Sequence, residues 1–103
     1  MPIVAVVEWP PTEGLDPKAE YARVAEELNG RPFTSPADWG GGLLAHVAAS
    51  ADDGASLVVD VWEDQASMDA WMERVMPLLS DHPDPSVRVM QTHNVVTGAP
   101  VSA

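Results

Sequence analysis

Hydrophobic residues recur with two different spacings along the chain, and the changes between these spacings predict its strands and helices. Residues 3–9 (IVAVVEW) are rich in β-branched side chains, and the two prolines that follow end the strand because proline cannot donate to a sheet ladder. Asp16 and Pro17 then supply a helix cap and a proline at the first helical position, and apolar residues recur at helical spacing as far as Leu28. A strand and a helix that closes at the next Asn-Gly pair are therefore expected.

The rest of the chain adds a hairpin, a second helix and a last strand. Residues 43–50 and 55–62 flank the turn-forming sequence ADDG, which predicts an antiparallel hairpin. Asp64 then offers a cap for a second amphipathic helix, and Pro77 within that pattern is expected to kink the helix or to split it. A last strand is predicted over residues 87–97. The apolar positions of the second helix, which we interpret as core, are Met68, Trp71, Met72, Val75, Met76 and Leu79.

The resulting order is βαββαβ, which is the order of ferredoxin-like α+β folds. In these folds two helices cover one face of a four-stranded antiparallel sheet. Residues 1–103 suit one such domain, with an irregular loop at 31–42 and a flexible tail at 98–103. No element remains to cover the second face of the sheet. Because a bare apolar face would expose a large patch to water, we expect a second copy of the chain to cover it and form a homodimer.

Several short strings of the sequence resemble those of a known group of proteins. They are the opening PIVAVVEW, the string VVDVWE at 58–63 before an Asp-capped helix that contains a proline, and HNVV at 93–96. These strings resemble those of the dimeric α+β barrel proteins of the antibiotic biosynthesis monooxygenase-like superfamily. The order of the predicted elements is similar over nearly the whole chain. The resemblance implies a dimeric barrel, and the group includes cofactor-independent oxygenases of polycyclic aromatics, polyketide cyclases, isomerases and haem-degrading enzymes. It specifies the fold better than the reaction.

Composition and charge restrict the partners of the protein. Sixteen acidic against five basic residues give a net charge of −11, which argues against binding to nucleic acids or anionic membranes because phosphates would be repelled. The absence of cysteine excludes a disulfide, a thiolate metal site and a cysteine nucleophile. The longest run of strongly apolar residues, 3–7, is far shorter than a membrane span, and no basic segment precedes it. We therefore expect no membrane span or signal peptide, and a location in the cytoplasm.

The predicted hairpin brings a histidine and an acid together. If the turn is centred near Asp53, His46 lies opposite Asp60, and Leu44 lies opposite Trp62, whereas a slip by one residue would destroy this pairing. The mixed face with His46, Asp60 and Trp62 is then expected to point into the barrel, and the uniformly apolar face to meet the helices. That apolar face comprises Leu43, Ala45, Val47, Leu57, Val59 and Val61.

The first and last strands supply further candidates for the cavity. Glu8 is expected on the cavity face of the first strand, with Val7 and Trp9 in the core beneath the helices. His93 and Asn94 lie on opposite faces of the predicted last strand, so at most one of the two can enter the cavity, and a bulge near Gln91 would reverse which one. The alternative for either residue is a purely structural role. The third histidine, His82, stands in a turn and is interpreted as a solvated loop residue. A histidine flanked by acids beside an indole wall is compatible with a pocket that handles protons. The alternative is structural: the His46–Asp60 pair only satisfies two polar groups at a dimer interface.

Two functional hypotheses follow. In the first, a cofactor-independent enzyme holds an apolar aromatic or polyketide-like molecule, with His46 as general base or acid, Asp60 as its orienting partner and Trp62 as a stacking wall. Glu8 and either His93 or Asn94 make secondary polar contacts. The base then starts an oxygenation, or it moves a proton in a cyclisation or isomerisation. In the second hypothesis, the protein is a non-catalytic dimer that binds an apolar small molecule, or one whose barrel is filled by its own side chains.

Metal and cofactor sites have weak support. His46, Asp60 and Glu8 form a conceivable facial ligand set, but no local spacing such as His-x-x-x-His supports it. The three glycines at 40–42 precede a strand and not a helix, so they lack the amide cradle that phosphates need. The histidine ligand that haem-binding relatives use has no counterpart that aligns here. We therefore expect no metal and no cofactor.

Overall fold

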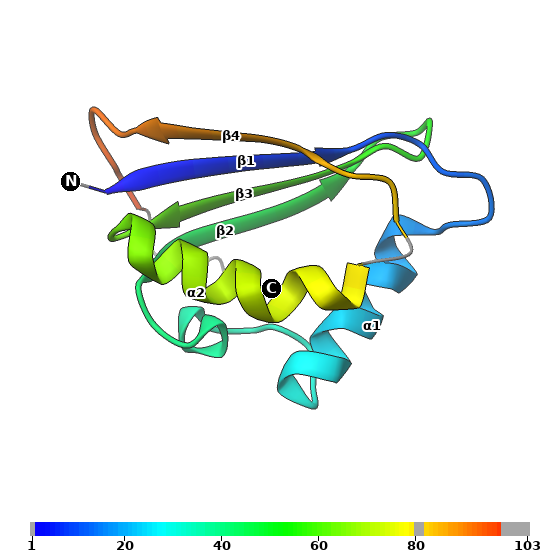
Figure 1. The fold of residues 1–103 in the computed structure, drawn as a ribbon, viewed down its shortest axis with the longest axis horizontal. Coiled ribbons are helices and arrows are strands. Elements are labelled where there is room, and N and C mark those ends of the chain that lie inside the picture. The colour runs from blue at the N-terminus through cyan, green and yellow to red at the C-terminus, as the bar shows by residue number, and fades with distance from the viewer. Residues whose placement is uncertain (1, 80–81, 98–103) are drawn as a thin grey trace.

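The computed structural model describes residues 2–79 and 82–97, and its sheet carries both helices on one face (Figure 1). The four strands are antiparallel in the order β2-β3-β1-β4, so the predicted ferredoxin-like α+β fold is confirmed. The predicted tail at 98–103 lies outside the described residues. The elements are β1 (Ile3–Trp9), α1 (Pro17–Asn29), β2 (Leu43–Ser50), β3 (Ser56–Trp62), α2 (Gln65–Val75) and β4 (Ser86–Gln91), with short 3-10 helices η1 (Pro36–Trp39) and η2 (Met76–Leu79).

Both long helices begin where the sequence predicted, and α1 also ends there. The Asp16 carboxylate accepts a hydrogen bond from the backbone N–H of Lys18 at 3.1 Å, and Gly30 ends α1 in the left-handed conformation at φ 72°. The α2 helix is capped by Asp64, which accepts from the backbone N–H of Ser67 at 2.8 Å. Pro77 splits the second helical segment into α2 and η2, because it cannot continue the α-helical hydrogen bonds. None of the helices among residues 2–79 and 82–97 is both long and apolar enough to span a membrane.

The predicted hairpin register is correct at its centre and wrong at one end. His46 lies opposite Asp60, as predicted. At the start of β2, however, Leu43 lies opposite Trp62 in place of Leu44, because a β-bulge falls between Leu43 and Ala45. The extra residue lets Leu43 and His46 face the same side of the sheet, although positions three apart in a regular strand point to opposite sides.

The assignment of the sheet faces was wrong for β2 and β3. Asp60 and Trp62 are buried on the side that the helices cover, while Val47, which was assigned to that side, is 56% exposed on the open face. On these two strands, the more uniformly apolar side therefore belongs to the open face of the sheet, which the helices do not cover. On β1 the prediction that Val7 lies beneath the helices is confirmed. The core cluster comprises Ile3, Ala5, Trp39, Leu43, Trp62, Met68 and Trp71.

The last strand is shorter than predicted. It ends at Gln91, and both the backbone N–H and the hydroxyl of Thr92 donate to the Pro2 carbonyl, at 3.1 Å and 2.8 Å. Because β4 pairs with β1 alone among the described strands and β1 begins at Ile3, residues 93–97 have no described strand left to pair with. His93 and Asn94 therefore follow the strand and are exposed.

Candidate active site

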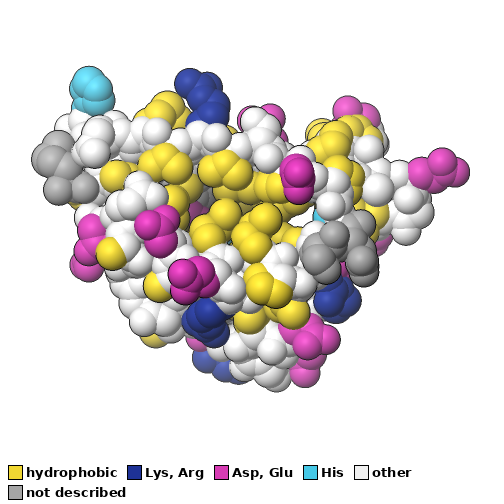
Figure 2. Space-filling model, viewed as in Figure 1, with side chains coloured by type: hydrophobic (Ala, Val, Ile, Leu, Met, Phe, Trp, Pro, Cys, Tyr) yellow, Lys and Arg dark blue, Asp and Glu magenta, His cyan; other side chains and the backbone are white. Residues whose placement is uncertain are grey.

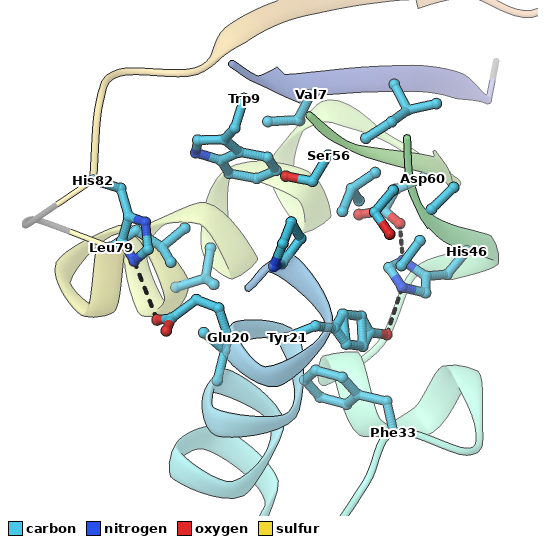
Figure 3. A pocket seen from close by; sticks show the side chains of 18 of the residues that line it. Val7, Trp9, Glu20, Tyr21, Phe33, His46, Ser56, Asp60, Leu79 and His82 are labelled. Carbon is cyan, nitrogen blue, oxygen red and sulfur yellow. Dashed lines mark hydrogen bonds and ion pairs between the residues drawn. The ribbon is translucent and has the colours of Figure 1, made fainter. Parts of the chain in front are cut away.

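Three side chains from three elements form a hydrogen-bonded chain between the helices and the sheet (Figure 3). The Tyr21 hydroxyl from α1 lies 2.7 Å from His46 Nε2 on β2, and His46 Nδ1 contacts Asp60 Oδ1 on β3. The Asp60 and His46 side chains are 8% and 15% exposed, so this polar chain is largely removed from water. We call Tyr21, His46 and Asp60 the polar triad.

The direction of proton donation in the polar triad depends on the tautomer of the imidazole. With Asp60 ionised and His46 neutral, the carboxylate only accepts, so the imidazole proton belongs on Nδ1 and is donated to Asp60. His46 Nε2 then carries a lone pair and accepts the hydrogen bond from the Tyr21 hydroxyl. The triad therefore places a proton acceptor, His46 Nε2, directly behind a phenol.

The environment of Tyr21 favours its neutral form. Burial raises the pKa of Tyr21 to about 12 from an ordinary value of 10.0, and the negative charge of Asp60 adds to the rise. Tyrosinate is therefore strongly disfavoured at neutral pH. Tyr21 acts as a proton donor in the resting site, and His46 is the group that can take up a further proton.

Aromatic side chains surround the imidazole. Trp39 packs against His46 with ring centroids 4.4 Å apart, and Phe33 packs against Trp39 at 4.3 Å. Tyr21 and Trp71 complete the cluster, each with its ring centroid 5.8 Å from that of Phe33. These rings exclude water from one side of the imidazole.

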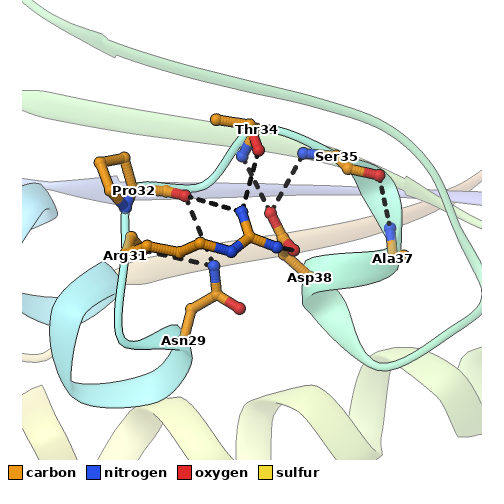
Figure 4. Close-up of polar contacts among 7 residues, drawn as sticks. All are labelled: Asn29, Arg31, Pro32, Thr34, Ser35, Ala37 and Asp38. Carbon is orange, nitrogen blue, oxygen red and sulfur yellow. Dashed lines mark hydrogen bonds and ion pairs between the residues drawn. The ribbon is translucent and has the colours of Figure 1, made fainter.

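The segment that carries Phe33 and Trp39 is held by a network around one carboxylate (Figure 4). Asp38 accepts hydrogen bonds from the backbone N–H groups of Thr34 and Ser35 at 2.9 Å and 3.1 Å, and from Arg31 at 2.8 Å. These bonds, with that from Thr34 first, hold the pKa of Asp38 below its ordinary value. The result is the short helix η1, which the sequence analysis interpreted as part of an irregular loop.

A cavity of about 560 Å³ extends from the polar triad along the space between the sheet and the helices. Its walls are mainly apolar, and Figure 2 shows hydrophobic side chains gathered around a hollow in this face of the molecule. Val7, Trp9, Val24 and Trp71 are among the lining residues. This open volume beside His46 and Asp60 counts against an interior filled by the protein's own side chains.

A second polar group lies in the cavity lining, away from the triad (Figure 3). His82 Nε2 lies 3.1 Å from a Glu20 carboxylate oxygen, and Arg23 bonds the same oxygen. The hydrogen bond from Arg23, followed by a smaller one from His82, lowers the pKa of Glu20 in spite of partial burial. His82 was interpreted as a solvated loop residue, but its side chain is only 11% exposed, because it folds onto α1 to reach Glu20.

The structure brings together some of the predicted site residues and separates others. His46 and Asp60 are in contact at the cavity, as the register predicted. Trp62 is 1% exposed within the core and is not among the described residues that line the cavity. Glu8 is exposed on the open face, because odd-numbered residues of β1 face the helices.

The remaining predicted contacts are displaced by the early end of β4. His93 and Asn94 are exposed and are absent from the described lining of the cavity. Tyr21 and Trp39 were not predicted as site residues. Tyr21 was counted only as one apolar position of a helix, although a hydroxyl on an apolar helix face was a usable signal. Trp39 gave no such signal, since it stands in a segment that was interpreted as a loop.

The structure also tests the conceivable metal set. Glu8 lies on the opposite face of the sheet from His46 and Asp60, so these three side chains do not converge. In the part of the chain that the structure describes, no group of three or more histidine, aspartate or glutamate side chains is arranged to hold a metal ion.

The fold is that of the antibiotic biosynthesis monooxygenase-like proteins, as the resemblance implied. NE2512, a protein of unknown function from Nitrosomonas europaea, has a TM-score of 0.71 at 16% identity, with 96% of each chain covered. The monooxygenase of gene ActVA-Orf6 from Streptomyces coelicolor, solved with nanaomycin D, has a TM-score of 0.57 at 21% identity, over 94% of this chain and 92% of that one.

A third structure carries a more specific description of its chemistry. SnoaB, a cofactor-independent oxygenase from Streptomyces nogalater, has a TM-score of 0.61 at 12% identity, over 94% of this chain and 98% of that one. No protein-family model matches the sequence, and no curated protein sequence matches it. At these identities the likeness establishes the fold alone, so the reaction has to be argued from the site.

Proposed function

We propose that the protein is a cofactor-independent enzyme that removes a proton from an apolar aromatic or polyketide-like molecule and lets the resulting carbanion react with O₂. The observation that carries this proposal is the polar triad at one end of an apolar cavity of about 560 Å³. The oxygenases among the proteins of the same fold support the choice of reaction.

Each member of the triad has a separate role. The substrate proton passes to the Tyr21 oxygen while the proton of Tyr21 moves to His46 Nε2, because the raised pKa of Tyr21 disfavours a free tyrosinate. Asp60 accepts the hydrogen bond of His46 Nδ1, which fixes the ring orientation and stabilises the imidazolium that forms. Tyr21 and His46 are thus the catalytic residues and Asp60 is a positioning residue.

The proposed reaction balances without metal or flavin. For anthrone, a tricyclic ketone with an acidic methylene group, loss of one proton leaves a carbanion that transfers an electron to O₂. The radical and superoxide combine to a peroxide, which takes up a proton and loses water. Anthrone and O₂ thus give anthraquinone and water, and the four electrons that reduce O₂ come from the methylene carbon. Anthrone is planar and apolar, which suits the aromatic lining.

Oxygen uptake with anthrone as substrate tests the proposal. His46→Ala and Tyr21→Phe are each expected to lower the rate by about 10²- to 10⁴-fold, the usual contribution of a general base. His93→Ala is the matched control, because that exposed histidine lies away from the cavity, and it should keep the full rate. Full activity in His46→Ala would defeat the proposal. Proton exchange into the substrate without oxygen uptake would indicate a cyclase or isomerase.

We also propose that a second copy of the chain covers the open face of the sheet. This face exposes Val47 on β2 and Met90 on β4, at 56% and 38%, on the side of the sheet that the helices do not cover. Light scattering should therefore report about twice the mass of the 11.0 kDa chain. Val47→Asp should shift the protein to the single-chain mass without loss of helical circular dichroism. A single-chain mass for the unmodified protein at micromolar concentration would overturn this part of the proposal.

A further inference from the structure

We infer that the cavity selects and orients substrates that carry an anionic group, and that Lys18 is the residue that recognises this group. The inference rests on the proposed function, because it names the substrate class of the same cavity. Lys18 is the only lysine of the chain, it lines the cavity, and it belongs to the first turn of α1. The chain as a whole, in contrast, has a net charge of −11.

Each carboxylate in the described cavity lining has a partner within the chain, whereas the Lys18 ammonium has none. These carboxylates are those of Glu20 and Asp60. Glu20 is paired with Arg23 and His82, and Asp60 is paired with His46. In contrast, the salt bridges among residues 2–79 and 82–97 do not include the Lys18 ammonium. The Lys18 ammonium is therefore a positive charge at the cavity that no described carboxylate pairs with.

This distribution of charge gives the cavity two unlike ends. The triad end holds the Asp60 carboxylate, whose charge a neutral imidazole does not cancel. Lys18 precedes Tyr21 by three residues on the same helix, so its backbone lies about 4.5 Å nearer the helix N-terminus, and its flexible stem extends the ammonium further. An anionic ligand is repelled from Asp60 and attracted to Lys18. It therefore turns its uncharged rings toward the triad.

Orientation of this kind serves the proposed chemistry. The carbon that loses a proton must approach Tyr21 and His46, and a carboxylate placed there would oppose the formation of a carbanion. Fixing the carboxylate on Lys18 keeps the two negative charges apart and leaves the acidic carbon facing the base. The expected substrate is a fused aromatic acid whose carboxylate is separated from the reacting carbon by at least one ring.

Binding measurements test the inference separately from catalysis. Anthraquinone-2-carboxylate and its uncharged carboxamide have the same ring system and no acidic methylene, so neither is turned over. Trp9, Trp39 and Trp71 line the cavity, and quenching of tryptophan fluorescence should report binding of both compounds. We expect the carboxylate to bind about two- to fivefold more tightly than the carboxamide, as for one solvent-accessible ion pair. The preference should shrink as salt is added.

Substitutions of Lys18 identify the source of the preference. In Lys18→Met the carboxylate should no longer bind more tightly than the carboxamide, while the affinity for the carboxamide stays unchanged. Lys18→Arg keeps the positive charge and should keep the preference. His82→Gln serves as the matched variant for an imidazole that also lines the cavity, and it should also keep the preference.

Each possible outcome decides a different point. Equal affinity for the two compounds in the unmodified protein overturns the role of Lys18 and leaves the proposed function standing. A preference that survives in Lys18→Met, or that is lost in His82→Gln, also overturns that role. If neither compound binds at any accessible concentration, the cavity is not a site for planar aromatic molecules. Both the inference and the proposed function then fail.

Discussion

The ionisation of Tyr21 is the property of the site that can be measured most directly. Tyr21 is the only tyrosine of the chain, so the absorbance change that accompanies phenol ionisation reports this group alone. Burial raises its pKa to about 12, and the charge of Asp60 makes the smaller contribution. We expect the native protein to keep Tyr21 neutral at pH values where the unfolded chain, with an ordinary pKa of about 10, has already lost the proton.

This difference makes stability depend on pH with a definite sign. Between the unfolded and the folded pKa, the folded state holds a proton that the unfolded state has released, so stability falls as pH rises. The contribution of Tyr21 is complete below about pH 10 and is lost as pH rises toward about 12. A rise of this size would correspond to about 2.7 kcal/mol for a fully buried phenol. Because Tyr21 is only half-buried, we expect solvent screening to leave about 1 kcal/mol.

Two measurements check this reasoning. An absorbance titration in native buffer, repeated in denaturant, should give the midpoint near 12 only in the folded protein, with circular dichroism recorded in parallel. Urea unfolding at about pH 9 and about pH 11 should show the extra loss of stability in the unmodified protein and not in Tyr21→Phe. Asp60→Asn should lower the midpoint only partly, because burial is the larger cause. A native-state midpoint near the ordinary value, with unchanged circular dichroism, would refute the buried Tyr21–His46 arrangement.

Three further predictions concern the framework of the site. Gly42→Ala should destabilise the protein by at least about 1 kcal/mol in urea unfolding, because Gly42 has a φ of 81° and an added Cβ would lie 2.3 Å from the Ser67 hydroxyl oxygen. The additional change Ser67→Gly should restore only part of this loss, since the backbone strain remains. Asp38→Asn should weaken the contact with Arg31 and lower stability at neutral pH. The difference from the unmodified protein should disappear as pH falls below 3.8, because a carboxylate with a lowered pKa contributes only while it is ionised. Trp39→Ala should cost about 3–5 kcal/mol of unfolding free energy, as is typical of removing a buried indole.

Local signals in the sequence were sufficient for the elements and their order. Asp16 and Gly30 mark the ends of α1 by short-range chemistry that tertiary packing does not change. Pro77 splits its helix for the same reason. The contact between His46 and Asp60 followed from the hairpin turn alone, because a turn fixes the register of the strands beside it. The contact between two of the three triad residues was therefore predictable without knowledge of the rest of the fold.

The third residue of the triad and the aromatic residues around it depend on packing between distant segments. Tyr21 reaches His46 only when α1 lies over the sheet, and neither residue carries a sequence signal for the other. Trp39 belongs to η1, whose formation depends on hydrogen bonds that converge on Asp38. His93 shows the opposite case, in which a β-like sequence continues after its partner strand has ended. Partners that are distant in the sequence decided each of these outcomes, so the local pattern of residues could not predict them.

The face of the sheet that holds the site depends on a single extra residue. Leu43 packs in the core and His46 lines the cavity, and in a regular strand these two positions would point to opposite sides. The bulge after Leu43 places both beneath the helices. Without it, one of them would face the open side of the sheet, and His46 would lose either Tyr21 or the register with Asp60. The bulge is thus as necessary to the polar triad as the three residues that form it, although it contributes no side chain to the chemistry.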